Sequence, residues 1–352
     1  MDLALTYDDV ALVPQYRNIS SRAEPTLQTW LTKDLEIGIP FIPANMDSVV
    51  GVEMAEAMHE RGGTAIHHRF RDPDETIELL KDIPYERRLI SWGSTKTDEL
   101  FSIIDTEPVY LVCIDVAHGH DTQVMKLVAE LKNHPTNPQV VAGNVCTAIG
   151  YQDLVNAGAD AVKVGIGPGA ACTTRIVTGF GLPQFTAVRD CAEVAKKLKV
   201  PIIADGGIRG SRDCVLALAA GATSVMIGKL FAATVESAAK KVWSCLESGP
   251  CSCTENVHEN DGFMFAQYRG QASRQFQEDY YGTVREGTVP EGEDMWIPVT
   301  GTVKELVDKL SGGLRSGMTY GGARTIQELQ RKAEFVQVTH SYQWESQVRE
   351  KG

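Results

Sequence analysis

The stretch from Gly165 to Arg175 reads Gly-Ile-Gly-Pro-Gly-Ala-Ala-Cys-Thr-Thr-Arg and places Cys172 behind three glycines and ahead of two threonines. The run before it, 158–165, has the pattern of a buried strand, so Cys172 is predicted on a strand-to-helix loop. Glycines in such a loop adopt positive φ and let backbone N–H groups approach a ligand closely. We therefore predict a nucleophilic cysteine and covalent catalysis, rather than an inert buried thiol in a turn.

Three further side chains could serve this nucleophile. Thr174 could relay a proton on the same loop, or it could cap the following helix. Glu291, within Pro-Glu-Gly, is a candidate acid or base if its segment folds over the site, and otherwise a solvated glutamate. Asp205, in Ile-Ala-Asp-Gly-Gly, ends a predicted strand. Its carboxylate could accept hydrogen bonds from ribose hydroxyls while glycine N–H groups bind phosphate; the alternative is a helix cap.

Three other groups of residues could also belong to a site. Asp115, followed by Val116 and Ala117, suits an edge that faces a cofactor. His67 and His68 fit either the core or the rim of the site, and they complete no metal set. Cys245, Cys251 and Cys253 resemble half a metal site, with His258 nearby, or else a flexible surface insertion.

The elements that must position these residues alternate regularly. Short apolar runs alternate with amphipathic helical segments from residue 37 to about residue 245, and polar residues follow nearly every run. This pattern predicts an α/β fold, a (β/α)₈ TIM barrel with its active site at the carboxyl ends of the strands. A doubly wound open sheet would use fewer strands. The predicted strands are 38–45, 63–67, 89–92, 109–115, 139–144, 161–165, 201–205 and 223–228; the clearest helices are 51–61, 121–133, 186–198 and 211–220.

The alternation stops at residue 246. We interpret 1–352 as a single catalytic barrel domain in which 246–300 is an insertion and mobile active-site flap, with 272–281 as its only regular piece, followed by a C-terminal extension. A helix is predicted at 302–310. A second glycine-rich loop is predicted at 312–322, where Arg315, Ser316 and Tyr320 could contact a ligand or a neighbouring subunit.

Composition excludes several classes of protein. The net charge of −12 argues against a general nucleic-acid binder, although backbone nests can still bind an anionic nucleotide locally. No run of eighteen apolar residues and no signal sequence is present, so a membrane span and secretion are not expected. The eight cysteines are then best interpreted as reduced thiols in a cytoplasmic protein.

Taken together, the motifs resemble the purine nucleotide oxidoreductases that comprise IMP dehydrogenase and GMP reductase. The likeness spans almost the whole chain, and in that family a cysteine attacks purine C2 while a nicotinamide exchanges hydride with the same carbon. The matching segments are Leu5–Val10, Asn45–Asp47, Cys113–Ala117, Ala142–Val145, the Cys172 loop, Ala204–Gly207 and Gly312–Ser316.

The resemblance favours the reductase branch of the family. Only about twenty residues separate His67 from Leu89, where dehydrogenases usually carry regulatory modules. The stretch 287–290 also lacks the Arg-Tyr dyad with which dehydrogenases activate water. The implied reaction is NADPH-dependent deamination of GMP to IMP. An IMP dehydrogenase without modules, which would use Arg285 or Glu286 as a base, and a catalytically weak nucleotide-binding protein are the alternatives.

The resemblance also implies roles for particular residues. Cys172, Thr174 and Glu291 would be catalytic, and a homotetramer would bring some cofactor contacts from a neighbouring subunit. Nucleotide contacts are implied at Asp205, Gly207, Gly228, Lys229, Gly270 and Gly292; cofactor contacts at Ser21, Arg22, Asp115, Val116, Ala117, Ser316 and Tyr320; and a monovalent cation (K⁺) at Gly167, Gly169, Cys172 and Arg175.

Departures from the family pattern leave some choices open. Thr288 stands where reductases have an arginine that contacts the nucleotide, with Arg285 as the nearest replacement, and Lys229 replaces Gly or Ser at the phosphate. The sequence therefore does not decide between NADPH and NADH, nor fix the nucleotide, the oligomer size or the role of the cysteine cluster.

Overall fold

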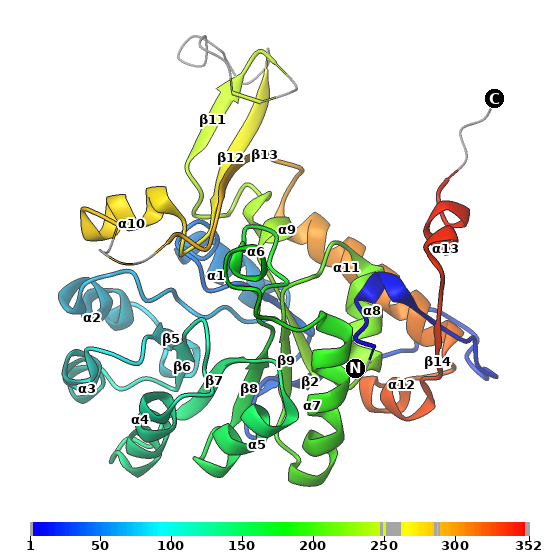
Figure 1. Ribbon diagram of the computed structural model, residues 1–352, viewed down its shortest axis with the longest axis horizontal. Coiled ribbons are helices and arrows are strands. Elements are labelled where there is room, and N and C mark those ends of the chain that lie inside the picture. Colours follow the sequence, from blue (N-terminus) through cyan, green and yellow to red (C-terminus); the bar gives the residue numbers. More distant parts are fainter. Residues whose placement is uncertain (1–2, 247–248, 251–261, 285–286, 288, 349–352) are drawn as a thin grey trace.

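Seven parallel strands form a curled sheet in the computed structural model of the chain, which describes residues 3–246, 249–250, 262–284, 287 and 289–348 (Figure 1). This arrangement confirms the predicted barrel-type α/β fold, with the carboxyl ends of the strands at one edge. The strands lie in the order β4 (Phe41–Pro43), β10 (Ser224–Ile227), β9 (Ile202–Asp205), β8 (Ala161–Val164), β7 (Gln139–Val145), β6 (Leu111–Asp115) and β5 (Leu89–Trp92).

Alternate residues of each strand fill the inside of the sheet. Cys113 of β6, Ala161 of β8 and Ile203 of β9 belong to one buried apolar cluster. Because side chains alternate with a period of two, the next inward positions are Asp115, Lys163 and Asp205. The interior of the sheet is thus apolar at its base and charged at the end where the predicted site lies.

Helices surround the sheet because each has one apolar face. In α7, Val188 and Cys191 of the predicted face are fully buried, whereas Leu198 at its end is exposed. The helices that follow the strands are α1 (Val52–Glu60), α2 (Pro73–Lys81), α3 (Thr97–Thr106), α4 (Thr122–Asn133), α5 (Ala148–Asn156), α6 (Thr174–Thr178), α7 (Gln184–Leu198), α8 (Ser211–Ala219) and α9 (Lys229–Ala232).

The strand predicted at 63–67 is present only as one isolated bridge. His67 pairs in parallel with Ile90, and its backbone N–H donates to the carbonyl of Leu89 at 2.8 Å. This segment therefore takes the position beside β5 where an eighth strand was predicted, without forming a regular strand there. A short single turn, η2 (Tyr85–Arg87), precedes β5.

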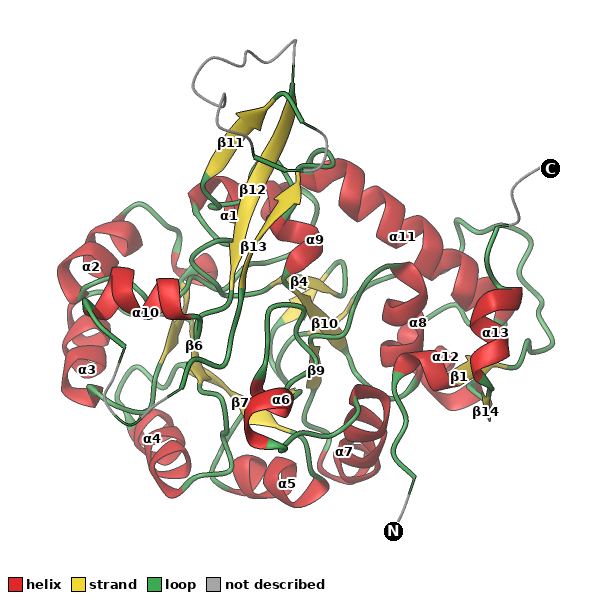
Figure 2. Cartoon of the chain, turned by 45° about the horizontal axis from the view of Figure 1, so that its top comes forward, coloured by secondary structure: helices red, strands yellow, loops and turns green. Residues whose placement is uncertain are grey.

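The prediction that 272–281 is the only regular part of 246–300 was wrong. Two strands of that segment, β12 (Phe263–Arg269) and β13 (Asp294–Pro298), form an antiparallel sheet with β11 (Lys241–Ser244). This sheet stands out from one end of the barrel, and α10 (Arg274–Tyr281), close to the predicted helix, lies beside its base (Figures 1 and 2). These strands were overlooked because neither Phe-Met-Phe-Ala-Gln-Tyr-Arg nor Asp-Met-Trp-Ile-Pro alternates strictly between apolar and polar residues.

The second glycine-rich loop was also predicted wrongly. Residues 303–320 form one continuous helix, α11 (Val303–Tyr320), which begins at a capping box of Thr302 and Glu305. A Cβ on Gly313 would lie 2.2 Å from the Ser211 hydroxyl, and one on Gly317 would lie 2.7 Å from Val215. The glycines thus let α11 approach α8 closely, instead of forming a ligand loop.

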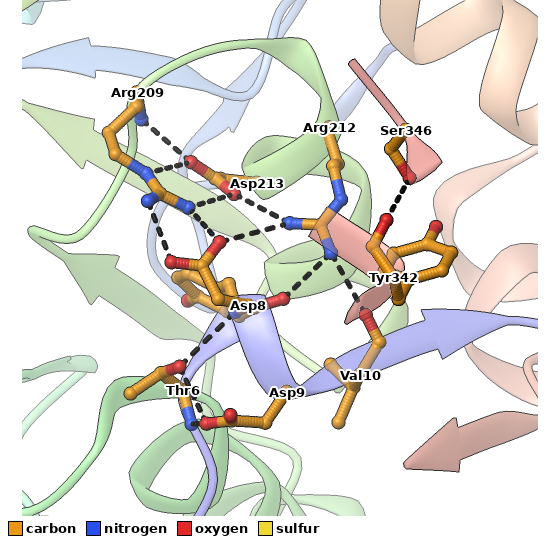
Figure 3. A network of polar contacts seen from close by, with 10 residues as sticks. Thr6, Asp8, Asp9, Val10, Arg209, Arg212, Asp213, Tyr342 and Ser346 are labelled. Carbon is orange, nitrogen blue, oxygen red and sulfur yellow. Dashed lines mark hydrogen bonds and ion pairs between the residues drawn. The ribbon is translucent and has the colours of Figure 1, made fainter. Parts of the chain in front are cut away.

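Both ends of the described chain pack against α8 and the loop after β9. The turn η1 (Tyr7–Asp9) leads into β1 (Val10–Leu12), which pairs with β14 (Phe335–Gln337). Figure 3 shows Arg209 and Arg212 joining Asp8 to Asp213 at this point. The remaining short elements are β2 (Thr29–Trp30), β3 (Glu36–Ile37), α12 (Ile326–Lys332) and α13 (His340–Glu345).

Candidate active site

The structure places Cys172, Thr174 and Glu291 in one hydrogen-bonded line. The Cys172 thiol donates to the Thr174 hydroxyl at 3.3 Å, and that hydroxyl donates to the Glu291 carboxylate at 2.7 Å. Cys172 lies on the loop between β8 and α6, as predicted, and Thr174 is the first residue of α6, whereas Glu291 lies 117 residues beyond Thr174 in the chain. The arrangement can carry a proton between the sulfur and the carboxylate through the threonine.

Backbone pairing holds the glutamate segment over the cysteine loop. Cys172 forms an antiparallel bridge with Gly292, Thr173 donates to the carbonyl of Glu291 at 3.0 Å, and the N–H of Glu293 donates to the carbonyl of Ala171 at 2.9 Å. On its other side, the Glu291 N–H donates to the carbonyl of Ala272 at 3.0 Å. Residues 291–293 are therefore fixed from both sides, which sets the position of the Glu291 side chain.

The cysteine loop is supported from below by Arg175. Its guanidinium donates to the carbonyls of Ile166 at 3.3 Å and Leu182 at 2.5 Å. Gly167 has a φ of +84°, and a Cβ there would lie 2.5 Å from the Arg175 side chain. Only glycine fits this position, because both the backbone conformation and the space exclude a side chain.

A buried ion triad lies beside the cysteine loop. The Lys163 ammonium donates to Asp115 at 2.6 Å and to Asp205 at 3.0 Å, and the Asn144 amide donates to Asp205 at 2.9 Å. Burial alone would raise the pKa of Asp115, but the charges of Lys163 and Arg69 outweigh it and hold that pKa below its usual value. Burial opposes the charge on Lys163, but the two carboxylates raise the pKa of its ammonium.

These groups border one cavity of about 270 Å³. The cavity gathers the Cys172 thiol, the Thr174–Glu291 pair and the ion triad around a common space that a ligand could fill. The predicted site residues that line it are Asp115, Val116, Ala117, Gly167, Gly169, Cys172, Thr174, Asp205, Gly270 and Glu291.

Other predicted residues do not line this cavity. Gly292 pairs through its backbone with Cys172, and a Cβ on Gly228 would lie 2.4 Å from the Tyr268 hydroxyl. Because Cys172 and Tyr268 line the cavity, the two glycines lie at its border. Ser316 and Tyr320 lie on α11, and the carbonyl of Tyr320 accepts from the N–H of Gln15. The full set outside the cavity lining is Ser21, Arg22, Arg175, Gly207, Gly228, Lys229, Gly292, Ser316 and Tyr320.

Three side chains of the cavity were missed from the sequence. Lys163 is a lone charge in an apolar strand, in phase with the inward residues, and this signal could have identified it. Arg69 lines the first cavity and also a second one of about 550 Å³, next to Trp92, Lys96 and Tyr280. Tyr268 lies on β12; burial, followed by the charges of Asp205 and Cys172, raises its pKa. No local signal marks Arg69 or Tyr268, because their positions depend on tertiary structure.

The histidines and the other cysteines show no metal site among the described residues, where no three His, Cys, Asp or Glu side chains cluster suitably. His67 is buried, and burial lowers its pKa to about 4 and that of His68 to about 3. Cys113, Cys146, Cys172, Cys191 and Cys214 carry free thiols. The described residues do not include Cys251, Cys253, His258, Arg285, Glu286 or Thr288.

No helix in the described part of the chain is long and apolar enough to cross a membrane.

Comparison with known proteins places this geometry in context. A family model described as "IMP dehydrogenase / GMP reductase domain" matches residues 4–349. Human GMP reductase 1 is 35% identical over 355 aligned positions, covering 97% of each chain. The IMP dehydrogenase of Borreliella burgdorferi is 35% identical over 391 positions, covering 96% of this chain and 95% of the relative. That of Aquifex aeolicus is 42% identical over 481 positions, covering 98% and 95%.

A solved structure agrees over the whole fold. A cysteine-to-alanine variant of GMP reductase from Trypanosoma brucei, in complex with guanosine 5'-monophosphate, superposes with a TM-score of 0.88 at 25% sequence identity. The match covers 100% of this chain and 99% of that one. The barrel and the sheet that stands out from it thus have a counterpart of nearly the same extent.

Proposed function

Because this chain belongs to the IMP dehydrogenase / GMP reductase family and is an oxidoreductase, we propose that it reductively deaminates GMP to IMP and ammonia with NADPH. The observation that carries the proposal is the line from Cys172 through Thr174 to Glu291. A nucleophile paired with a proton carrier suits loss of an amine, which must be protonated as it leaves.

The relatives support the reductase reaction on length. The alignment with human GMP reductase 1 runs over 355 positions, close to the 352 residues of this chain. The alignment with the Aquifex aeolicus dehydrogenase runs over 481 positions, so that relative carries segments that this chain lacks. The Borreliella burgdorferi dehydrogenase, at 391 positions, carries far fewer, so length supports the proposal without deciding it.

The proposed reaction proceeds in two steps at purine C2. The Cys172 thiol passes its proton through Thr174 to Glu291 as the sulfur forms a bond to C2 of GMP. The bond from C2 to the 2-amino group then breaks, and Glu291 and Thr174 give that proton to the amine, which leaves as ammonia. The resulting thioimidate accepts hydride at C2, after which the C–S bond breaks to release IMP and the Cys172 thiolate. NADPH would supply that hydride when bound.

The cavity offers suitable places for both ligands. Asp205 has one carboxylate oxygen bound by Lys163 and Asn144, and we propose that its other oxygen accepts from the ribose of the nucleotide. Gly270 lines the same cavity. We propose further nucleotide contacts at Gly207, Gly228, Lys229 and Gly292, at its border. The cavity is also lined by Asp115, Val116 and Ala117, at the end of β6, which β7 and β8 separate from Asp205 on β9. We propose that these three residues contact the nicotinamide.

A K⁺ ion would be held by carbonyl oxygens of the cysteine loop. Among the described residues, the carbonyls of Gly167 and Cys172 accept no hydrogen bond, while Gly169 and Arg175 each accept one. Carbonyl oxygens are suitable ligands for K⁺, so these residues fit such an ion. Bound there, it would steady the loop that carries Cys172. Omitting K⁺ from the assay, with Na⁺ as the control, tests this proposal.

We also propose a cytoplasmic homotetramer in which 246–300 acts as a mobile flap of a single barrel domain. The N-terminal segment contains Ser21 and Arg22, and α11 contains Ser316 and Tyr320. A hydrogen bond from the Arg315 side chain of α11 to the carbonyl of Pro25 joins the two segments. We propose that these four residues contact the cofactor of a neighbouring subunit. Light scattering coupled to gel filtration would give the oligomer size.

The experiment that tests the function is a nicotinamide absorbance assay with purified protein in potassium buffer. Consumption of NADPH with GMP, together with stoichiometric ammonia, is the expected result; NADH in place of NADPH measures cofactor preference. Formation of NADH from IMP and NAD⁺ would instead establish the dehydrogenase reaction, which the names of several relatives favour. Absence of both reactions would overturn the proposal.

A further inference from the structure

Lys163 is a fully enclosed ammonium that two carboxylates share. Only 3% of its side chain is exposed, and it lies 2.6 Å from Asp115 and 3.0 Å from Asp205. The three residues come from three different strands, β6, β8 and β9, and all line the cavity. A Cβ on Gly143 would lie 2.5 Å from the Cβ of Lys163, so the neighbouring strand closes directly over the lysine.

Each carboxylate offers only one oxygen to Lys163 and leaves its other oxygen clear of the lysine. In Asp205, Oδ2 accepts from both Lys163 and Asn144. In Asp115, Oδ1 accepts from Lys163, while Oδ2 lies 3.9 Å from the guanidinium of Arg69. Asp205 is the proposed nucleotide contact and Asp115 the proposed cofactor contact, so one cation lies between the two ligand sites.

Removing the ammonium would bring the two carboxylates into conflict. Both lie within hydrogen-bond distance of one atom, and like charges so close in a buried site favour protonation of one of them. Arg69, a second cation nearby, pairs with Asp115 on the side away from Lys163. A change at Asp115 can therefore affect Asp205 through Lys163, although neither carboxylate bonds the other.

We propose that Lys163 is a positioning residue that keeps Asp115 and Asp205 ionised together and thereby couples cofactor binding to nucleotide binding. This inference rests on the proposed function, since it assigns the two carboxylates to two ligands. It predicts that the effect of Lys163 on nucleotide affinity, measured with no cofactor present, depends on the residue at position 115, on the cofactor side.

The first test compares substitutions of two lysines near β8, the buried Lys163 and the half-buried Lys132. Lys132, the matched control, pairs with the buried Asp160 at 2.9 Å, one residue before β8 and away from the cavity. Isothermal titration with GMP and with IMP should show that K163M weakens nucleotide binding at least about tenfold, that K163R recovers much of the loss, and that K132M has no effect. Equal affinity of K163M and the wild type would overturn the inference.

The second test uses Asp115 to separate coupling from structural damage. In the K163M background, D115N removes the like charge, so nucleotide affinity should recover by about threefold or more; D115N alone should change it less than about threefold. If Lys163 has only a structural role, D115N will give no recovery in K163M, and the inference fails. Thermal melts identify any variant that does not fold. If K163M does not fold, K163R is combined with D115N in its place.

The two proposals fail in different ways. If the wild-type protein binds neither GMP nor IMP, the proposed function fails before the lysine is tested. If the wild type binds nucleotide and turns over, but the K163M, D115N pair behaves additively, only the inference about Lys163 fails.

Discussion

Three residues form the hydrogen-bonded line at the candidate site: a cysteine thiol, a threonine hydroxyl and a glutamate carboxylate. The Cys172 sulfur donates to Thr174, and Thr174 donates onward to Glu291, so the threonine hydroxyl links nucleophile and carboxylate. Each member has a different task in the proposed reaction: attack, relay and proton supply. The three can be separated by substitution because all of them lie on loops or at a helix start outside the strands of the barrel.

We expect C172A to abolish turnover while nucleotide binding persists. Alanine removes the sulfur that bonds to C2, and no other described cysteine lines the cavity. Loss of activity of more than about a thousandfold, with the GMP dissociation constant within about threefold of wild type, is the expected pair of results. Residual turnover at about a hundredth of the normal rate would rule out covalent catalysis by Cys172.

We expect E291Q to lower kcat by about a hundredfold to ten-thousandfold, because glutamine keeps the geometry but carries no transferable proton. T174V should give a loss of similar order, and the double variant should be little worse than either, because both act on one proton path. The exposed neighbour Glu293 provides the control, since E293Q leaves the backbone contacts of the flap in place. Multiplicative losses in the double variant would contradict a shared path.

At this scale, the sequence identified residues whose motif surrounds them and missed those that act across the fold. Cys172, Thr174 and Asp205 lie beside glycine runs, so their chemistry was predictable from their neighbours. Lys163 was overlooked because a strand of mostly apolar residues was interpreted only as core. Its partners, Asp115 and Asp205, lie 48 and 42 residues away in the chain.

At the scale of elements, the flap is attached to the barrel through Arg269. Its guanidinium donates to Asp47, on the loop after β4, at 2.8 Å, and to Asp279 on α10 at 2.6 Å; it also lies 5.1 Å from the Phe276 ring. Gln271 donates to the carbonyl of Asn45 at 2.9 Å. The flap is therefore fixed to the rim by the ion pair with Asp47 and the hydrogen bond from Gln271, while Asp279 and Phe276 hold the Arg269 side chain within the flap.

We expect R269M to loosen the flap and to lower kcat about tenfold, with faster amide exchange over 270–284, because Asp47 and Asp279 lose their shared partner. The control is R274M on α10, the helix that carries Asp279. Among the described residues, Arg274 makes only a 3.6 Å ion pair with the exposed Glu278 of the same helix. Unchanged exchange in R269M would show that the backbone pairing at Gly292 suffices to hold the flap.

We expect the buried histidines to make stability fall in mild acid. Burial lowers the pKa of His67 to about 4, below the ordinary value of 6.5, so the unfolded chain takes up a proton that the folded protein refuses. The free energy of unfolding should decrease as the pH falls from 6.5 towards 4, by roughly 2–3 kcal/mol for His67. Urea titrations at several pH values should show about one linked proton fewer in H67Q; an identical slope would contradict this account.

The glycine-rich segment 312–322 was predicted wrongly for a physical reason. Glycines 312–322 were interpreted as a loop, yet Gly313 and Gly317 lie four residues apart on the face of α11 that meets α8. Sequence spacing alone cannot distinguish a flexible glycine from one that allows close helix packing. The capping box at Thr302 was a correct local signal for the beginning of that helix, and the error concerned only its end.

At the scale of the whole molecule, the N-terminal turn η1 and the loop after β9 are held together by two arginines. Arg209, four residues after Asp205, donates to Asp8 at 2.6 Å and to Asp213 at 3.0 Å, and Arg212 donates to the carbonyls of Tyr7 and Val10 at 3.0 Å each (Figure 3). A Cβ on Gly207 would lie 3.4 Å from the Tyr7 ring. The N-terminal turn therefore supports the back of the loop that follows β9.

We expect R209M to lower the free energy of unfolding by about 1–2 kcal/mol, because the buried Asp213 loses one of its two arginine partners while much of Arg209 is exposed to solvent. The nucleotide dissociation constant should rise modestly, since the loop after Asp205 loses its attachment. R189M, which breaks an exposed pair with Asp190, should change neither quantity. A stable R209M with normal binding would separate the chain ends from the site.

The two ionic clusters on β8 also bear on how the barrel folds. Asp160, just before the strand, forms an ion pair with Lys33 and accepts hydrogen bonds from Lys132 and the Val140 N–H. Lys163 lies between its two carboxylates at the other end of the strand. Parallel strands of similar apolar sequence can slide past one another, and a slip of one residue would turn Lys163 out of the barrel. A slip of two would displace it by about 6.6 Å. Either error leaves buried charges unpaired at both ends at once, so the lysine that organises the site also selects the correct register of the sheet.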